Sequence, residues 1–252
     1  MAKKKTSRAK KSASPKPPFW RRLGKWIATL FVWGMIGSLF VVGWFYTGLP
    51  DIEDSLAPSR RPTLWIMAAD GQEIAAVGDL YGIPVKLSDL PPALPQAVLA
   101  TEDRRFYDHF GIDLIGLARA MVTNIRAGRI VQGGSTITQQ VAKNMYLWSG
   151  KSFLRKGIEA YFTVLIEVAW SKKRILEVYV NIAEFGPGIY GVGAASAAFF
   201  GKSPVELSDA KAAFLAAVLP NPKQLRVDNP TPYVRERQNW IIKQMQRLRR
   251  EQ

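Results

Sequence analysis

Hydrophobic residues follow two patterns along the chain, and the first is continuous. Residues 26–49 form an apolar run without any charged side chain. About 20 consecutive apolar residues allow a helix to cross the hydrocarbon core of a bilayer, so the run predicts one transmembrane helix. It is longer than the apolar core of a signal peptide, and it ends in the bulky residues Trp44, Phe45 and Tyr46 instead of a small-residue cleavage site. A buried core helix is the alternative.

The second pattern has helical spacing and dominates the chain after Pro95. The predicted helices cover residues 96–103, 114–127, 135–147, 151–170, 172–185 and 210–219, with a last basic helix from about 231. Asp113 and Ser171 are suited to cap helix N-termini, and Gly128 is suited to end a helix. The segment from Ser203 to Glu206 matches a capping box with proline at the first helical position.

A short β element precedes these helices. Residues 63–77 predict a hairpin, because the pair Asp70-Gly71 is a strong turn signal. The whole pattern therefore predicts a mainly α fold. It consists of a single N-terminal transmembrane helix and a helical domain with a small β element near the membrane.

Charge is unevenly distributed and gives the transmembrane helix a direction. The net charge is +15, and ten basic residues but no acid lie in residues 1–25. Positive residues before a transmembrane helix keep that end in the cytoplasm, and Asp51, Glu53 and Asp54 follow the helix. We therefore expect a basic cytoplasmic tail at 1–25, a transmembrane helix at 26–49 and an external domain at 50–252. A nucleic-acid arm is the alternative for the tail.

Composition and motifs exclude several functions. The chain has no cysteine and one histidine, His109, which excludes thiolate and multi-histidine metal sites as well as disulfides. A GxGxxG match at 186–191 is predicted to follow a helix instead of a strand, which argues against a dinucleotide site. Two SxxK matches lack a Lys-Thr-Gly partner, so no penicillin-binding acyl-transfer domain is indicated. Because ATP is absent outside the cytoplasmic membrane, the domain must use an activated substrate or catalyse hydrolysis.

Polar residues gather at the start of two predicted helices. On the helix at 135–147, Thr136, Gln140 and Lys143 share one face and form a row of donors without an acid. On the helix at 151–170, Arg155 and Lys156 lie four and three residues before Glu159. Cations at this spacing favour the ionised form of the carboxylate. A solvated helix face, with pairs worth a few tenths of a kcal/mol, is the alternative for both groups.

Four segments in order resemble the motifs of the family 51 glycosyltransferases, the peptidoglycan polymerases. They are residues 102–111 (EDRRFYDHFG), 134–144 (GSTITQQVAKN), 155–159 (RKGIE) and 172–181 (KKRILEVYVN). A weaker fifth segment at 237–242 (RQNWII) ends in Ile-Ile where the family more often has Val-Leu. The resemblance covers about residues 60–245. With one anchor and no transpeptidase motif, the chain resembles the monofunctional members of that family.

The resemblance implies a lysozyme-like helical domain that polymerises lipid II into β-1,4-linked glycan strands. The donor anomeric carbon is inverted and undecaprenyl pyrophosphate is released, so no ATP is required. The family assigns proton abstraction from the acceptor hydroxyl to the residue matching Glu102. It gives the residue matching Glu159 a role near the leaving group. Two forms of that role stay open: holding a divalent cation, Mg²⁺ or Mn²⁺, or orienting the neighbouring cations.

The resemblance also implies substrate-binding residues, partners and a location. The residues are Asp103, Phe106, His109, Ser135, Thr136, Gln140, Lys143, Asn144, Arg155 and Lys156. For Asp103, Phe106 and His109, the alternative is a structural role in shaping the loop after Glu102. Expected partners are lipid II, the growing glycan strand, the membrane and proteins of cell-wall synthesis or division, with no nucleic acid. The expected location is the inner membrane, crossed once, with a cytoplasmic N-terminus and a periplasmic catalytic domain.

Two other functions fit part of the pattern. A lysozyme-like hydrolase or lytic enzyme also uses two acids, but one of them must stay protonated, and the cations beside Glu159 oppose that. A membrane-tethered scaffold without catalysis would not require both Glu102 and Glu159.

A second membrane contact is predicted within the external domain. Residues 113–131 form an apolar segment that carries Arg119, Arg126 and Arg129. We expect this segment to enter the headgroup region of the bilayer. A helix packed in the ordinary way is the alternative.

Overall fold

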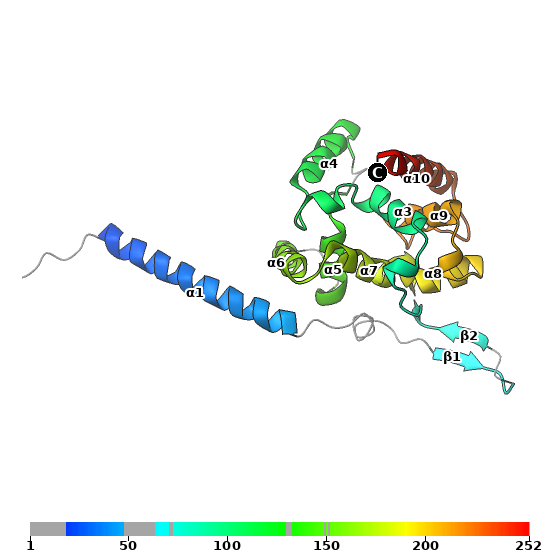
Figure 1. Cartoon of the computed structure of the whole chain (residues 1–252), viewed down its shortest axis with the longest axis horizontal. Coiled ribbons are helices and arrows are strands. Elements are labelled where there is room, and N and C mark those ends of the chain that lie inside the picture. The colour runs from blue at the N-terminus through cyan, green and yellow to red at the C-terminus, as the bar shows by residue number, and fades with distance from the viewer. Residues whose placement is uncertain are drawn as a thin grey trace, which may run out of the picture. The chain divides into compact units, whose positions relative to one another are not determined.

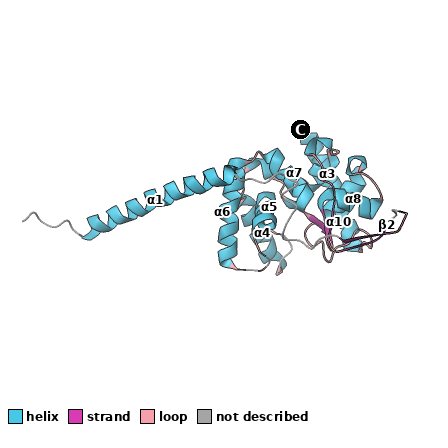
Figure 2. Cartoon of the chain, turned by 90° about the horizontal axis from the view of Figure 1, so that it is seen from below, coloured by secondary structure: helices cyan, strands magenta, loops and turns pink. Residues whose placement is uncertain are grey.

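The computed structural model describes residues 19–47, 64–70, 73–129, 133–148, 150 and 152–251, and it divides the chain into two compact units, 1–49 and 50–252. The described part of the first unit is the helix α1 (Phe19–Thr47), drawn in Figure 2. The described side chains of α1 are exposed. Among the described residues, α1 is the one helix that is long and apolar enough to cross a membrane, over Phe19–Val41. The helix thus begins before residue 26, where the apolar run starts.

Several predictions fall outside the described residues. They concern the tail up to residue 18, residues 48–49, the acids Asp51, Glu53 and Asp54, Thr63 and Gly71 of the hairpin, residues 130–131, and the helix start at Lys151.

The second unit is mainly helical, as the sequence predicts (Figure 1). Its helices are α3 (Ala93–Glu102), α4 (Leu114–Ala127), α5 (Ile137–Tyr146), α6 (Phe153–Ala169), α7 (Lys172–Ile182), α8 (Gly191–Phe200), α9 (Asp209–Val218) and α10 (Pro232–Glu251). Single 3-10 turns occur at Leu87–Asp89, Phe106–Asp108 and Pro204–Glu206. The mainly α class with a small β element is confirmed.

The strands form two small sheets. β1 (Leu64–Met67) and β2 (Glu73–Val77) pair in an antiparallel hairpin, which confirms the prediction for this segment. The second sheet has the order β3-β5-β4, from β3 (Leu80–Tyr81), β4 (Glu184–Gly186) and β5 (Ile189–Tyr190). The sequence did not predict this sheet, because its strands are only two or three residues long and pair across the domain.

The core lies where small and branched side chains of several helices meet. α9 packs against α3 and α10, and four of its five alanines are completely buried, namely Ala212, Ala213, Ala216 and Ala217, so the helices approach closely. α7 packs against α5 and α8 and contributes seven buried side chains between Ile175 and Ile182, where only Glu177 is not fully buried. In contrast, α4 has a single buried residue, Ala120, and exposes most of its apolar side chains. α4 is therefore attached much less firmly than the core helices.

Polar side chains of α7 fasten the chain segment that leads into α3. The side-chain amide of Asn181 donates to Val85 O (2.8 Å), and Asn181 Oδ1 accepts from Val85 N (2.9 Å). Glu177 Oε2 accepts from Leu87 N (2.7 Å). Burying these polar groups is favourable only because each has a partner. This part of the fourth motif therefore has a structural function.

Several helix boundaries differ from the predictions. α3 begins at Ala93 and contains Pro95, which the first turn tolerates because N–H groups there need no helical partner. α7 ends at Ile182 because the chain then enters β4. The predicted capping box after Ser203 forms only a 3-10 turn without a side-chain cap. By contrast, the Ser171 cap is confirmed, since its hydroxyl accepts from Arg174 N.

The GxGxxG segment also differs from its prediction. It lies in the antiparallel β4–β5 turn, so the expectation that it directly follows a helix is wrong. The dinucleotide motif instead requires a strand that opens a parallel βαβ unit. Its last glycine, Gly191, has φ +79° and starts α8.

Gly191 provides a test of this packing. A Cβ there would lie 2.5 Å from Asn181 O, and the left-handed φ is itself unfavourable for alanine. Gly191→Ala should lower the free energy of unfolding by at least about 1–2 kcal/mol. Gly157→Ala, in α6 with no atom within 4 Å of the added Cβ, should instead raise it by about 0.5–1 kcal/mol. Thermal and denaturant unfolding in detergent measure both, and equal stabilities would contradict the packing described.

Candidate active site

A cleft of about 1130 Å³ crosses the helical unit. Its walls come from the C-terminal end of α3, the loop before α4, α4 itself, α5, the start of α6 and α10. Ten of the twelve predicted site residues line it: Glu102, Asp103, Ser135, Thr136, Gln140, Lys143, Asn144, Arg155, Lys156 and Glu159. Phe106 and His109 do not line the cleft.

Glu102 is the last residue of α3 and is half-buried. Its Oε2 accepts a hydrogen bond from Gln140 Nε2 (2.7 Å), and Gln140 Oε1 accepts from the buried Tyr179 hydroxyl (3.4 Å). Burial raises the pKa of Glu102 above its ordinary value. The Gln140 hydrogen bond and the charges of Arg237 and Lys143 lower this pKa and so oppose the shift. A carboxylate with a raised pKa is suited to accept a proton.

Glu159 lies in a different environment, with a cation on each oxygen. Its side chain is 3% exposed, Oε2 accepts from Arg155 Nη1 (3.1 Å), and Oε1 is paired with Lys156 Nζ. Lys143 of α5 lies close to the same group. Desolvation lowers the pKa of Lys143 below its ordinary value, and the charge of Glu159 partly opposes this shift. Separating a buried carboxylate from its cationic partners costs free energy, because an unpaired charge is then left in the protein interior. Glu159 therefore holds Arg155 and Lys156 in place. The interpretation as a solvated face does not apply here.

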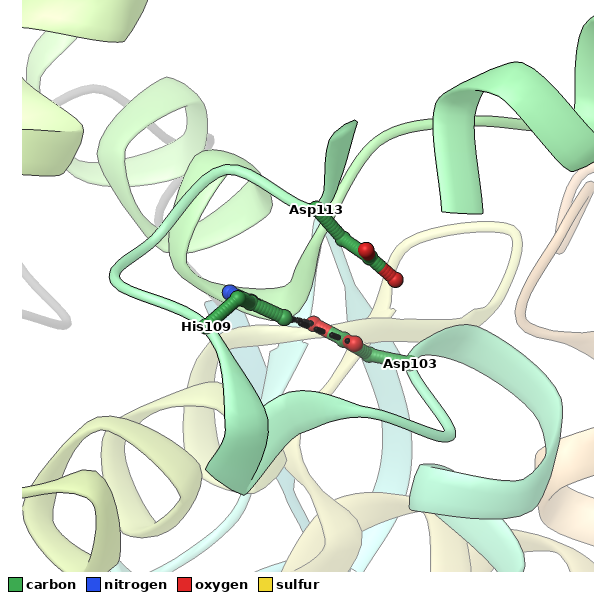
Figure 3. A group of neighbouring side chains, drawn as sticks. All are labelled: Asp103, His109 and Asp113. Carbon is green, nitrogen blue, oxygen red and sulfur yellow. Dashed lines mark hydrogen bonds and ion pairs between the residues drawn. The ribbon is translucent and has the colours of Figure 1, made fainter. Parts of the chain in front are cut away.

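A metal bound at Glu159 would have to compete with the ion pairs of this residue. Both of its oxygens already serve Arg155 and Lys156. Among the described residues, the one group of three acidic or histidine ligands close enough to hold an ion is Asp103, His109 and Asp113 (Figure 3). That group is already bonded within the protein, as described next. Neither group offers the free oxygen ligands that Mg²⁺ prefers, and the surroundings of Glu159 fit the cation-orienting role.

Asp103 braces the loop that follows Glu102. His109 Nε2 lies 3.0 and 3.1 Å from the two Asp103 oxygens, and Ile137 N donates to Asp103 Oδ2 (3.1 Å). Figure 3 shows the two side chains pointing at each other, with Asp113 beside them. Burial raises the pKa of Asp103, and the hydrogen bond with His109 opposes this. These contacts support the structural interpretation of His109.

Two further residues complete this brace. Thr136 caps α5, and its hydroxyl donates to Gly111 O (2.6 Å). Phe106 is almost completely buried, with Lys172 Nζ 4.5 Å from the centre of its ring.

Asp113 precedes α4 but does not cap it with its side chain, contrary to the prediction. Its carboxylate accepts from Arg105 Nη1 instead (3.1 Å).

Several cleft residues were absent from the predicted site. They are Tyr179, Asn221, Tyr233, Arg237 and Trp240, together with the arginines of the loop after Glu102. Arg237 and Trp240 lie in the weak fifth motif, which is the sequence feature that could have indicated them as site residues. The Nε atoms of Arg155 and Arg237 are buried without a hydrogen-bond partner among the described residues.

Comparison with known proteins identifies the family of this chain. Residues 70–246, most of the chain, match the family described as Transglycosylase. The chain belongs to the transglycosylase family.

Similar transglycosylases occur in several bacteria. A biosynthetic peptidoglycan transglycosylase of Salmonella arizonae is 48% identical over 222 residues, which are 88% of this chain and 87% of the relative. One from Shewanella oneidensis is 52% identical over 162 residues, 64% of this chain and 69% of the relative. Penicillin-binding protein 1A of Haemophilus influenzae has a solved structure with a TM-score of 0.41 and 24% identity, covering 75% of this chain and 18% of that one.

The hydrogen bond between Gln140 and Glu102 predicts the effect of a substitution in this transglycosylase. The bond favours the ionised carboxylate, so Gln140→Leu should raise the pKa of Glu102 further. Infrared titration of the carboxyl band, assigned by subtracting the spectrum of Glu102→Gln, measures this pKa. Asn144→Leu removes another amide from the cleft and should leave the pKa unchanged. An unchanged or lower pKa in Gln140→Leu would contradict the described contact.

Proposed function

We propose that the protein is a peptidoglycan glycosyltransferase that polymerises lipid II into β-1,4-linked glycan strands. One observation carries the proposal: a single cleft of a transglycosylase-family chain holds a half-buried carboxylate of raised pKa, Glu102, and a cation cluster around the buried Glu159. These are the two groups that transfer from a pyrophosphate donor requires. The relatives' names agree with this activity.

Glu102 is the general base in this proposal. The acceptor 4-hydroxyl attacks the anomeric carbon of the donor, and its proton passes to the Glu102 carboxylate as the new C–O bond forms. Gln140 keeps that carboxylate in place through its hydrogen bond. Because the base must be ionised, activity should fall as the pH drops through the raised pKa of Glu102.

The cation cluster stabilises the leaving group. As the bond between the anomeric carbon and the pyrophosphate oxygen breaks, negative charge grows on the pyrophosphate, and Lys143, Arg155 and Lys156 are fixed where they can oppose it. Glu159 keeps Arg155 and Lys156 in position. Attack from the face opposite the leaving group inverts the anomeric carbon.

The same arrangement disfavours hydrolysis. A glycosidase protonates a sugar oxygen that leaves, so one of its carboxyl groups must carry a proton. Glu102, with its raised pKa, suits that task, but a glycosidase also needs a second carboxylate that is free to act on water or on the sugar. Both oxygens of Glu159 are already paired with Arg155 and Lys156, so Glu159 is not free for this second role. A scaffold without catalysis would not explain why the cleft gives Glu102 and Glu159 two contrasting environments.

The substrate requires work at a membrane surface. In this proposal α1 anchors the protein in the inner membrane with its N-terminus in the cytoplasm, and residues 50–252 act in the periplasm. α4 is the second contact, and its exposed apolar side chains are Leu114, Ile115, Leu117, Met121, Val122 and Ile125. Arg126 and Arg129 are exposed near the end of α4, whereas Arg119 lines the cleft. Proteins of cell-wall synthesis or division remain proposed partners.

The central experiment compares Glu102→Gln with wild-type protein on labelled lipid II in detergent. The variant should fold normally but lose polymerisation by at least about 10²–10⁴-fold, because the proton acceptor is gone. Glu206→Gln, an exposed acid outside the cleft, should polymerise normally. Near-normal polymer from Glu102→Gln would remove the base role. Wild-type protein that shortens pre-formed glycan without making polymer would favour the hydrolase.

The membrane contact of α4 is tested on residues 51–252 alone. This domain should co-sediment with vesicles that contain phosphatidylglycerol, because α4 offers apolar and cationic side chains to the interface. Met121→Asp with Ile125→Asp should abolish co-sedimentation. Val205→Asp, an exposed apolar position on another element, should not. Equal binding by all three proteins would place the membrane contact elsewhere.

A further inference from the structure

A chain of polar side chains from three helices ends at the Glu102 carboxylate. The hydroxyl of Tyr179 on α7 donates to Gln140 Oε1 on α5 (3.4 Å), and Gln140 Nε2 donates to Glu102 Oε2 on α3 (2.7 Å). Tyr179 is 1% exposed, although it belongs to the wall of the cleft. The mechanism proposed above uses the bond between Gln140 and Glu102 and gives Tyr179 no role.

Tyr179 acts as a hydrogen-bond donor in this chain. Gln140 Oε1 is an amide carbonyl oxygen, so the hydrogen between the two residues must come from the phenol. Burial raises the pKa of Tyr179 well above its ordinary value, and the charge of Glu102 adds to this shift. The phenol therefore keeps its proton at neutral pH, and its bond to Gln140 does not depend on the titration of Tyr179.

The contact with Tyr179 favours one orientation of the Gln140 amide. In this orientation the N–H group faces the Glu102 carboxylate and the carbonyl oxygen faces the phenol. If the amide were flipped, its carbonyl oxygen would face the carboxylate, and two acceptors would repel each other. Hydrogen bonds in a chain also polarise one another, so an amide whose carbonyl accepts a bond is a stronger donor. Both effects strengthen the bond that Glu102 receives.

We propose that Tyr179 is a positioning residue of the reaction, and that it acts on the base Glu102 through the Gln140 amide. This assignment rests on the proposed function and deepens it. Because Gln140 is bonded at both ends of its amide, α7 and α3 together fix where its N–H group points. The carboxylate that accepts this N–H is thereby held in one place while the acceptor hydroxyl approaches it.

Tyr179→Phe isolates this effect from the other groups that act on Glu102. These groups are the cations Lys143 of α5 and Arg237 of α10 and the neighbouring Asp103. The substitution keeps the buried ring, removes one hydroxyl and changes no charge. The pKa of Glu102 should rise further, since its hydrogen-bond donor is weaker. Because the base must be ionised, the fall of kcat at acidic pH should then begin at a higher pH than in wild-type protein.

The experiment compares Tyr179→Phe in two backgrounds of the full-length protein, with Gln140 and with Gln140→Leu. Polymerisation of labelled lipid II in detergent is followed over a range of pH, and infrared titration follows the Glu102 carboxyl. With Gln140 present, Tyr179→Phe should lower kcat about two- to threefold below the pKa of Glu102 and leave KM unchanged. With Gln140→Leu it should have no further effect on either measurement, because the amide through which it acts is absent.

A matched control is Tyr161→Phe. It removes the same hydroxyl group from an exposed tyrosine of α6 that does not line the cleft, and it should change neither the pH profile nor the infrared titration. Thermal unfolding confirms that each variant is folded.

Three results would overturn the assignment. They are an unchanged pH profile in Tyr179→Phe, a loss of activity that is equal at every pH, and a loss that is equal with Gln140 and with Gln140→Leu. The last two would limit Tyr179 to the packing of the cleft. If wild-type protein forms no polymer, the proposed function fails and the assignment fails with it. If wild-type protein polymerises and Tyr179→Phe matches it in rate and titration, the assignment alone fails.

Discussion

The geometry of the cleft depends on the hydrogen bonds of the buried Asp103 carboxylate. This carboxylate is hydrogen-bonded to His109 of its own loop, and it accepts a hydrogen bond from the Ile137 N–H in the first turn of α5. A buried carboxylate is stable only when such partners satisfy it, so the loop and the helix cannot separate without exposing an unpaired group. The position of Glu102 at the end of α3, within reach of Gln140 on α5, follows from this link.

The two acids of the cleft, Glu102 and Glu159, lie in contrasting surroundings. Glu102 has an amide as its nearest polar partner, and desolvation raises its pKa. Glu159 has a cation on each oxygen. One sequence motif supplies a carboxylate suited to take a proton, and another supplies a carboxylate suited to hold cations. Environments that separate the behaviour of two carboxyl groups are a general way to assign acid–base roles.

The light packing of α4 fits a substrate that is anchored in lipid. This helix contributes one buried side chain, while α7 and α9 are buried along much of their length. α4 nevertheless supplies Arg119 to the cleft. A helix that buries little of its apolar surface against the core can present that surface to a bilayer or to a lipid chain. The same element thus connects the proposed membrane contact to the binding of substrate.

The sequence by itself determined the features that depend on neighbouring residues. The apolar helix, the cap at Ser171, the stop of α4 at Gly128 and the ion pairs of Glu159 all follow from spacing within a few turns. Only the tertiary structure decided the rest. The sheet of β3, β5 and β4 joins strands from distant parts of the chain, and Arg237 and Trp240 reach the cleft from the last helix. The raised pKa of Glu102 likewise arises from burial under residues remote in sequence, because desolvation depends on what surrounds a group in space and not on its neighbours in the chain.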